Sequence, residues 1–257
     1  MFYFRFMKKY LVFASFVILS CSKGEDESSS YSEDNKNDII GQQLNSGNIY
    51  FENETCKCPD ALNGDKDVIG GITYTAVNNS SIKDEIANGN IYLCTTLVTD
   101  MSGTSISNTF QNFFNNNSFN SNISFWDVSN VINMDGMFFN ADLFNQDISN
   151  WDTSKVENMG SLFKNASSFN QSISNWNTSK VTKMLDLFRG ARTFNQDISN
   201  WDTSSVTSMS NMFDGATSFN QDISSWCVSN FGFEPENFST NSPLIDSYKP
   251  IWGNCPE

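Results

Sequence analysis

Acidic side chains recur along this chain in two rows, and carboxylates in fixed rows could bind a cation or catalyse a reaction. The first row is interrupted by a serine and contains Asp147, Asp197 and Asp222. The second is interrupted by an asparagine and contains Asp127, Asp152 and Asp202. Calcium takes about six to eight oxygen ligands, but neither row carries the glycine-rich pattern of calcium-binding β-helices. Turns and helix caps built on Asp side chains explain the second row more simply. We therefore predict no metal site and no cofactor, and leave calcium binding open.

A catalytic use of these acids is not favoured. A glycosidase needs one singular pair of carboxyl groups about 5–10 Å apart, whereas these acids recur as turn residues. The chain contains no histidine for a catalytic triad, no glycine-rich phosphate loop and no metal-binding cluster. We predict that the protein is not an enzyme and assign no catalytic residue. A carbohydrate-active enzyme remains the less favoured alternative.

Positive side chains are confined to a short part of the chain between residues 119 and 243. They are Lys155, Lys164, Lys180, Lys183, Arg189 and Arg192. Two pairs share a position 25 residues apart, and like charges stacked about 5 Å apart are unfavourable unless water screens them or an anion binds. One hypothesis is a patch for an anionic ligand, such as an acidic protein or a sulfated glycan. The alternative is ordinary solvated charge. The net charge of −14 argues against a nucleic-acid partner.

The first residues could carry a lipid. Residues 7–21 read MKKYLVFASFVILSC, in which two lysines precede an apolar run too short to span a bilayer. We predict a signal peptide over residues 1–20, whether the start is Met1 or Met7. The run ends in Ile-Leu-Ser-Cys, which resembles a bacterial lipobox. That resemblance implies that Cys21 is lipidated and becomes the mature N-terminus. An ordinary signal peptide with a chance cysteine is the alternative.

Residues 21–47 contain the lipidated cysteine and a predicted acidic tether. Serine and acidic residues dominate this segment, and such a composition cannot bury a core. The acidic run from Glu25 to Glu27 resembles the surface-export signal of lipoproteins in Bacteroidetes. We therefore predict an exported outer-membrane lipoprotein, held to the membrane by its lipid and exposed at the cell surface.

An exported chain is expected to form disulfides. Either Cys56 or Cys58 could pair with Cys94, which leaves one thiol over. A zinc site would need a fourth ligand that these three cysteines do not have. Cys227 replaces the Asp or Asn that follows each other tryptophan of the repeat, and we predict that it pairs with Cys255 near the end of the chain.

A tandem repeat of 25 residues must position all of these side chains. The stretch FNQDISNWDTSKVENMGSLFKNASS at 144–168 returns as FNQDISNWDTSSVTSMSNMFDGATS at 194–218. Tryptophan, phenylalanine, isoleucine and methionine recur in strict register. A fixed period in this range is typical of a solenoid, in which each unit buries its apolar row against its neighbours. We predict such a solenoid over residues 101–243.

Each unit is expected to contain one helix and one strand. Val206, Met209, Phe213 and Ala216 are spaced by three, four and three residues, which predicts a short helix or 3₁₀ turn over 205–216, capped by Ser204. The FNQDIS stretch that follows is predicted to be a parallel strand.

Residues 48–100 are predicted to form a small α+β cap on the first edge of the solenoid. We expect strands at 48–51 and 91–98, a hairpin of 67–69 with 72–77 around two glycines, and a helix over 82–88 that stops at Gly89. Residues 244–257 are predicted to be a closing segment, clamped over the last unit by the Cys227–Cys255 disulfide.

The pattern V-T-x-M-x-x-M-F-x-x-A-x-x-F-N-Q-D-I-S-x-W-D-T-S resembles the BspA-type leucine-rich-repeat surface lipoproteins, over residues 48–257. The resemblance implies an α/β repeat fold, an LRR-like right-handed solenoid with short parallel strands and short helices. It also implies an adhesive or protein-binding role at the cell surface. We therefore predict a monomeric, non-catalytic binding or adhesion module whose partner is a protein or glycan of a host or neighbouring cell. A structural spacer without a ligand is the alternative.

Overall fold

The computed structural model describes residues 47–106, 109–111 and 118–256, and the side chains of 104–111 are not described. These described residues form one compact unit by their internal contacts. The predicted signal peptide, Cys21 and the acidic tether lie outside the described residues.

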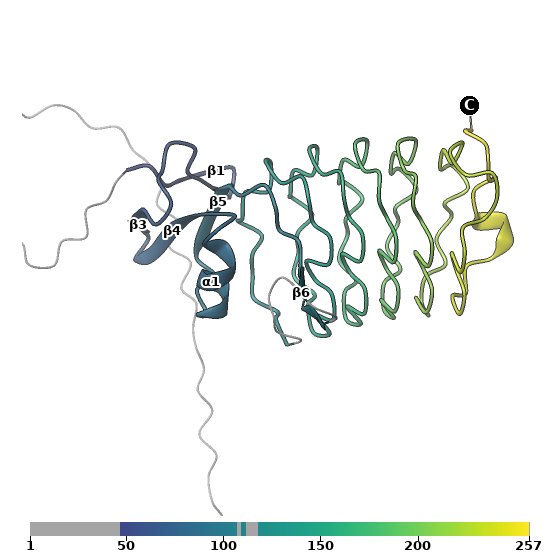
Figure 1. Cartoon of the computed structure of the whole chain (residues 1–257), viewed down its shortest axis with the longest axis horizontal. Coiled ribbons are helices and arrows are strands. Elements are labelled where there is room, and N and C mark those ends of the chain that lie inside the picture. Colours follow the sequence, from purple (N-terminus) through teal and green to yellow (C-terminus); the bar gives the residue numbers. More distant parts are fainter. Residues whose placement is uncertain (1–46, 107–108, 112–117, 257) are drawn as a thin grey trace, which may run out of the picture. The chain divides into compact units, whose positions relative to one another are not determined.

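The N-terminal part of this unit contains most of its regular structure (Figure 1). Strands β1 (Tyr50–Glu52) and β2 (Thr55–Lys57) form an antiparallel hairpin. Strands β3 (Lys66–Ile69) and β4 (Ile72–Asn78) form a second hairpin, and β5 (Leu93–Leu97) pairs in parallel with β4. Helix α1 (Ile82–Ala87) connects β4 to β5. The elements expected between 67 and 98 are therefore present, whereas β2 was not predicted.

Glycines define the turns of this segment. Gly70 and Gly71 join β3 to β4 with φ angles of 61° and 83°, values that favour glycine and suit a two-residue hairpin. Gly89 follows α1 with φ of 82°, as expected for a glycine that ends a helix. Ser81 occupies the N-cap position of α1, but its side chain makes no capping hydrogen bond.

The predicted α/β repeat solenoid with LRR-like helices and strands is wrong. Between residues 118 and 256 the described chain forms no regular strand, and its only helix is the 3₁₀ turn η1 (Asp246–Tyr248). The remaining strands, β6 (Thr104–Ile106) and β7 (Thr109–Gln111), form a two-stranded antiparallel sheet. The described residues therefore combine three small sheets with almost no helix, and the repeat units consist of turns.

The helix predicted at 205–216 does not form, because two of its residues have left-handed backbone angles. Asn211 has φ of 55° and Gly215 has φ of 72°, which an α-helix does not tolerate. Met212 N–H donates to the carbonyl of Met209, and Ala216 N–H donates to that of Phe213, so each turn closes over three residues. Successive turns thus reproduce the spacing of three, four and three residues that suggested a helix.

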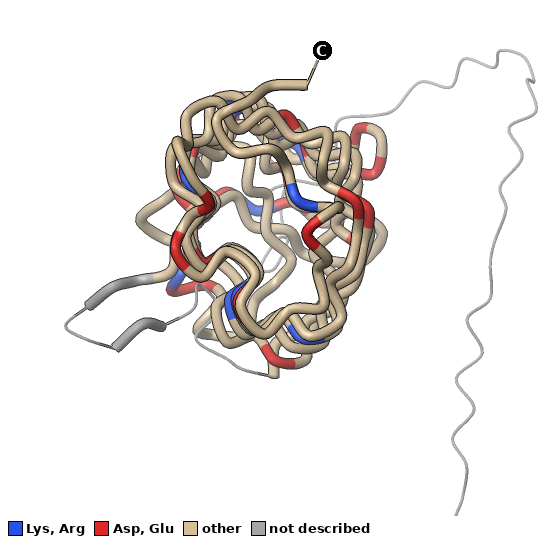
Figure 2. The backbone as a smooth tube through the Cα atoms, turned by 90° about the vertical axis from the view of Figure 1, so that its right-hand side faces the viewer, with Lys and Arg blue, Asp and Glu red and all other residues tan. Residues whose placement is uncertain are grey.

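Neighbouring units are joined along this turn segment instead. In the second unit, the N–H groups of alternate residues donate to carbonyls 24 residues further along the chain. These bonds run from Met159, Ser161, Phe163 and Asn165 to Lys183, Leu185, Leu187 and Arg189, over 2.7–3.0 Å. The parallel β-bridges between these units are isolated pairs, which join Asn133 to Asn158, Asn158 to Lys183 and Lys183 to Ser208. Seen end-on, the repeat units superpose closely (Figure 2).

The strand predicted at FNQDIS does not form. Its asparagine N–H donates to a side-chain oxygen of the preceding unit and not to a backbone carbonyl. Asn170 N–H donates to the side-chain oxygen of Asn145 over 2.9 Å, and Asn195 N–H donates to that of Asn170 over 3.0 Å. One asparagine in each unit therefore satisfies a backbone N–H of the next unit, and these residues form the asparagine row Asn120, Asn145, Asn170 and Asn195. No ladder of paired backbone groups forms along this described stretch.

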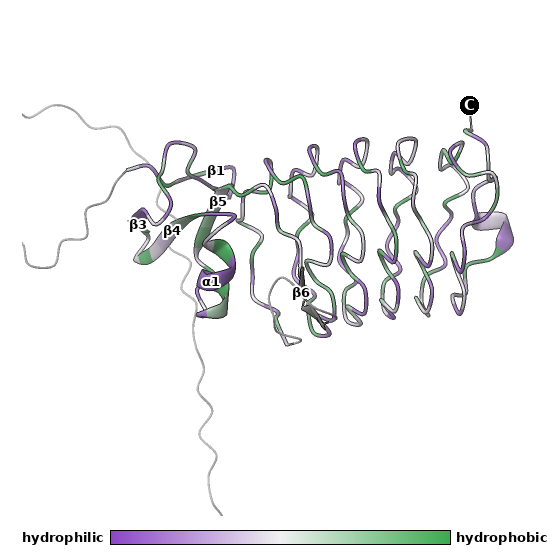
Figure 3. Cartoon of the chain, in the orientation of Figure 1, coloured by the Kyte–Doolittle hydropathy of each residue, from purple (hydrophilic) through white to green (hydrophobic). Residues whose placement is uncertain are grey.

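The core consists of aromatic rows that run through the units. The ring centroids of Phe119, Phe144, Phe169, Phe194 and Phe219 follow one another at 5.9–6.0 Å. A second row, from Phe138 to Phe213, has spacings of 5.4–5.7 Å and contacts the first at 4.0 Å. Ile82 and Ile86 of α1 join the same core, and α1 is hydrophobic on one side and polar on the other (Figure 3).

Candidate functional site

Ion pairs occupy part of the predicted cationic patch. Lys164 Nζ lies 2.8 Å from Asp186 Oδ2, and Arg189 Nε lies 3.1 Å from Asp214 Oδ2. Arg189 also approaches the second oxygen of Asp186 at 3.5 Å. The two cations and two acids thus form one network across three repeat units. Exchanging Lys164 and Arg189 for glutamate would turn these attractions into repulsions, so that exchange is expected to destabilise the fold.

The other four cations do not complete a strip with that pair. Lys155 Nζ donates to Asn130 Oδ1 over 2.6 Å. Lys180, Lys183 and Arg192 have exposed side chains at three different repeat positions. In the end-on view, basic and acidic segments lie near one another at several corners (Figure 2). Solvated and paired charge therefore fits this geometry better than a patch for an anionic ligand.

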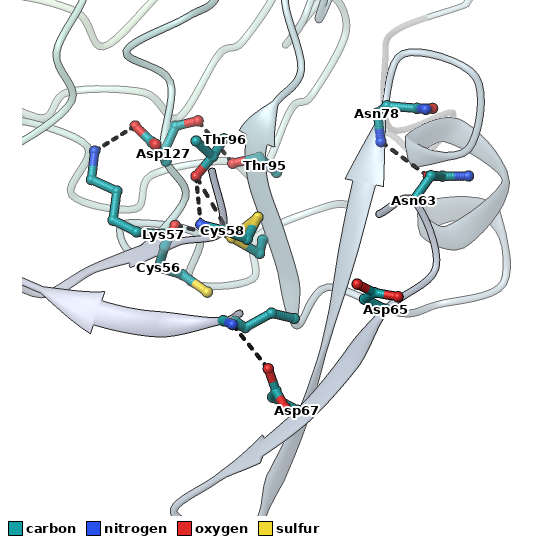
Figure 4. Close-up of a disulfide and its surroundings, with 12 residues drawn as sticks. Cys56, Lys57, Cys58, Asn63, Asp65, Asp67, Asn78, Thr95, Thr96 and Asp127 are labelled. Atoms are coloured by element: carbon teal, nitrogen blue, oxygen red, sulfur yellow. Dashed lines mark hydrogen bonds and ion pairs between the residues drawn. A yellow bond between two sulfur atoms is a disulfide. The ribbon is translucent and has the colours of Figure 1, made fainter. Parts of the chain in front are cut away.

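Four of the six cysteines are joined in pairs. Cys58 bonds Cys94 with a Cα–Cα distance of 6.1 Å, which ties the end of β2 to β5. Cys227 bonds Cys255, with 4.0 Å between their Cα atoms. Cys56 is buried and free (Figure 4). Burial, with a smaller contribution from the charge of Asp127, raises the pKa of its thiol to about 12. Such a thiol is almost fully protonated at neutral pH and is a poor nucleophile.

Asp127 joins the N-terminal part to the first repeat unit (Figure 4). Its side chain is 2% exposed and its Oδ1 lies 3.0 Å from Lys57 Nζ. Burial alone would raise the pKa of Asp127, but hydrogen bonds from Ser129, Thr96 and Lys57 outweigh it and lower the pKa. The carboxylate is therefore ionised and paired, which suits a structural joint.

The acids of the first row are held in turns. Oδ1 of Asp147, Asp197 and Asp222 accepts the N–H of the serine two residues later, over 2.9–3.0 Å. The second row forms the same turns, for example from Ser204 N–H to Asp202 Oδ1. Hydrogen bonds from these serines lower the pKa of each first-row acid. Within the described residues, no three His, Cys, Asp or Glu side chains gather to hold a metal ion.

Shallow grooves follow the Gln-Asp-Ile-Ser edge, which we call the groove face. The first has a volume of about 310 Å³, and its lining consists of Glu54, Asn122, Ser124, Gln146, Asp147, Ser149 and Asn150. The second, of about 260 Å³, has a lining of Asp197, Ser199, Gln221, Asp222, Ser224 and Ser225. Apart from Glu54, both grooves use the same six repeat positions, three units apart. The repeat therefore builds one kind of polar groove more than once.

An aromatic cluster that was not predicted from the sequence is carried by the chain segments that supply Glu54 and Ser124 to the first groove. It consists of Phe51, Tyr74, Tyr92 and Phe125. One signal was visible in the sequence, because Phe125 stands where the following units have Asn150, Asn175, Asn200 and Ser225. The other three rings come from the N-terminal strands and the segment before β5, and only the fold brings them together.

Comparison with known proteins gives a family and no function. No curated protein and no solved structure matches the chain. No helix among the described residues is long and apolar enough to cross a membrane. The family described as "Mycoplasma protein of unknown function, DUF285" matches residues 88–184 and 170–243. Since these residues make up more than half of the chain and contain the repeat, the protein belongs to the DUF285 family.

Proposed function

We propose that this protein is an exported surface lipoprotein that acts as a non-catalytic binding or adhesion module. The groove face is the observation that carries the proposal. The resemblance of the repeat to BspA-type surface lipoproteins and the lipobox-like sequence at Cys21 support the location.

The groove face presents polar groups in fixed positions. Gln171 and Gln196 each donate from Nε2 to the side-chain oxygen of an asparagine in the preceding unit, over 3.1 and 3.0 Å. The neighbouring aspartates are held by their serines. Amides and carboxylates have several donor or acceptor sites, so these contacts leave further capacity for a ligand. Side chains that are already ordered lose little entropy on binding.

The same geometry disfavours a glycosidase. Its acid catalyst must hold a proton near neutral pH, which requires a raised pKa. Asp147, Asp197 and Asp222 have lowered pKa values because their serines hydrogen-bond to the ionised form. These acids suit the binding of donors rather than the delivery of protons. A spacer without a ligand would not need the grooves or the exposed rings of the aromatic cluster.

A whole-cell assay tests the proposal. Full-length protein made in a bacterium with lipoprotein export should incorporate a palmitate analogue, and a Cys21→Ser variant should not. Purified, fluorescently labelled full chain should bind saturably to at least one member of a panel of bacterial and animal cells. Equal lipid labelling of both proteins would contradict the anchor. Absence of saturable binding throughout the panel would favour the spacer.

A further inference from the structure

One buried tyrosine holds three other rings of the aromatic cluster in place. Tyr74 is 7% exposed and meets the rings of Phe51, Phe125 and Tyr92 edge-on, with centroids 5.2, 5.8 and 5.9 Å away. The rings of Tyr92 and Phe125 are nearly parallel, at 16° and 6.4 Å. Edge-to-face and offset contacts of this kind are the favourable geometries for aromatic pairs. The cluster is therefore rigid before any ligand arrives.

Much of this cluster faces water. Phe51 is 40% exposed and Tyr92 is 42% exposed. Two of the four exposed aromatic side chains in the described part of the chain belong to this cluster, and the other two are Tyr50 and Phe233. Core packing explains Tyr74 and the partly buried Phe125, but it does not explain exposed rings in a group. Exposed apolar groups that cluster often mark a binding site.

The cluster and the first groove are continuous along the chain. Ser124 lines the groove and precedes Phe125, while Glu54 lines it from the turn that follows β1, three residues after Phe51. Cys56 N–H donates to the Phe125 carbonyl over 2.8 Å, which fixes the β1–β2 hairpin against the first repeat unit. This backbone contact holds the hairpin that carries Phe51 and Glu54 against the segment that carries Ser124 and Phe125.

We propose that this site binds a neutral glycan, an inference that rests on the proposed binding function. A sugar ring has faces lined by C–H groups and a rim of hydroxyls that both donate and accept. Aromatic rings offer such a face apolar area and a negative π surface. Amides, serine hydroxyls and a carboxylate bind the rim, as Asn150, Gln146, Ser149 and Asp147 could do here. A few polar groups beside an apolar wall are typical of sites for small ligands.

Charge selects against other ligands. The lining of the first groove contains two acids, Glu54 and Asp147, and no cation. The lowered pKa of Asp147 keeps its carboxylate ionised, so an anionic glycan would be repelled. A basic peptide would be attracted to the acids, but five of the seven lining residues are uncharged. The balance of donors and acceptors favours a neutral ligand over a cationic one.

The second groove indicates that the glycan is a polymer. It repeats six lining positions of the first groove at a distance of three units. Successive units are spaced by 5.9–6.0 Å between stacked Phe rings, a distance comparable to the length of one sugar. A chain that stacks on the aromatic cluster and follows the groove face would therefore meet equivalent polar groups further along.

Native gel electrophoresis of the full chain through soluble neutral polysaccharides tests this proposal. The probes are a β-glucan, a mannan, a galactomannan and a xylan. At least one should retard the wild-type protein, and retardation should be the same in 50 and 500 mM sodium chloride. Phe51→Ala and Tyr92→Ala should each weaken binding about tenfold, since each loses one stacking face. Phe233→Ala removes a ring that is more exposed, at 79%, and lies outside the cluster, so it should have no effect.

Three results would overturn the proposal. They are no retardation by any of the four polysaccharides, unchanged retardation of both Phe51→Ala and Tyr92→Ala, and binding to polylysine that salt abolishes, which would indicate a basic peptide. If labelled protein still binds whole cells while all four polysaccharides fail, only the glycan assignment is lost. If cell binding also fails, the proposed function fails with it.

Discussion

Replacing Phe169 by alanine is expected to lower the free energy of unfolding by about 3–5 kcal/mol. Its ring is fully buried and lies 5.9 Å from Phe144, 6.0 Å from Phe194 and 4.0 Å from Phe163. Removal leaves a cavity in the middle of both aromatic rows, where the neighbouring units are fixed by backbone hydrogen bonds and cannot easily close it. Urea denaturation followed by tryptophan fluorescence measures the change.

Phe233 provides the matched control for this experiment. Its ring is 79% exposed, so Phe233→Ala should change the free energy of unfolding by less than about 0.5 kcal/mol. Equal losses for the two variants would mean that the phenylalanine row does not hold the units together.

Loss of the Cys227–Cys255 disulfide is expected to cost about 3–4 kcal/mol in the chain-entropy account. The bond closes a loop with a sequence separation of 28, and both cysteines are replaced by serine to remove it. The closing segment also packs Trp252 edge-on against Phe238 at 4.9 Å, and Val228 N–H donates to the Asn254 carbonyl over 2.8 Å. These contacts should keep the segment folded at low temperature.

Denaturant unfolding of the double variant in the absence of reductant measures this loss. A Cys56→Ser variant changes a free thiol and should leave both disulfides in place, which makes it the control for thiol chemistry. An unchanged midpoint for the double variant would show that packing alone holds the closing segment.

The sequence was sufficient to predict which side chains are buried. Phe144 and Phe169 share one repeat position, and Trp176 belongs to the tryptophan row. Each side chain was therefore expected to pack against its counterpart in the next unit, and all three are buried. The glycine pair before β4 likewise identified a hairpin, because few other residues adopt its backbone angles.

The backbone of each unit could not be predicted in the same way. Ser161, Asp186 and Asn211 share one repeat position and have φ between 51° and 57°. None of them is glycine, so these three residues did not mark their position as left-handed, although Gly190 and Gly215 stand at the second left-handed position of their units. The asparagine row had a similar effect, because a side-chain oxygen that replaces a backbone acceptor removes a strand without changing the hydrophobic pattern.

The functional surface depended most on three-dimensional information. Lys164 and Arg189 looked like stacked free cations until Asp186 and Asp214 of adjacent units came into contact with them. The aromatic cluster combines residues from positions 51 to 125, and only the fold shows that their rings meet.

The central claim is that the groove face binds a ligand while the buried rows hold the structure. The most direct measurement compares two sets of substitutions that the repeat itself contains. The groove variant changes Asp147, Asp197 and Asp222 to serine, the residue at position 172. The control changes Asp152 and Asp202 to asparagine, the residue at position 177. Both should melt within a few degrees of the wild type, since serine and asparagine can keep the turns.

Saturable binding of labelled full chain to cells is then measured for all three proteins. We expect the groove variant to lose most of its binding and the control to retain it. Full binding by the groove variant, or equal loss by both variants, would contradict the assignment of function to this face.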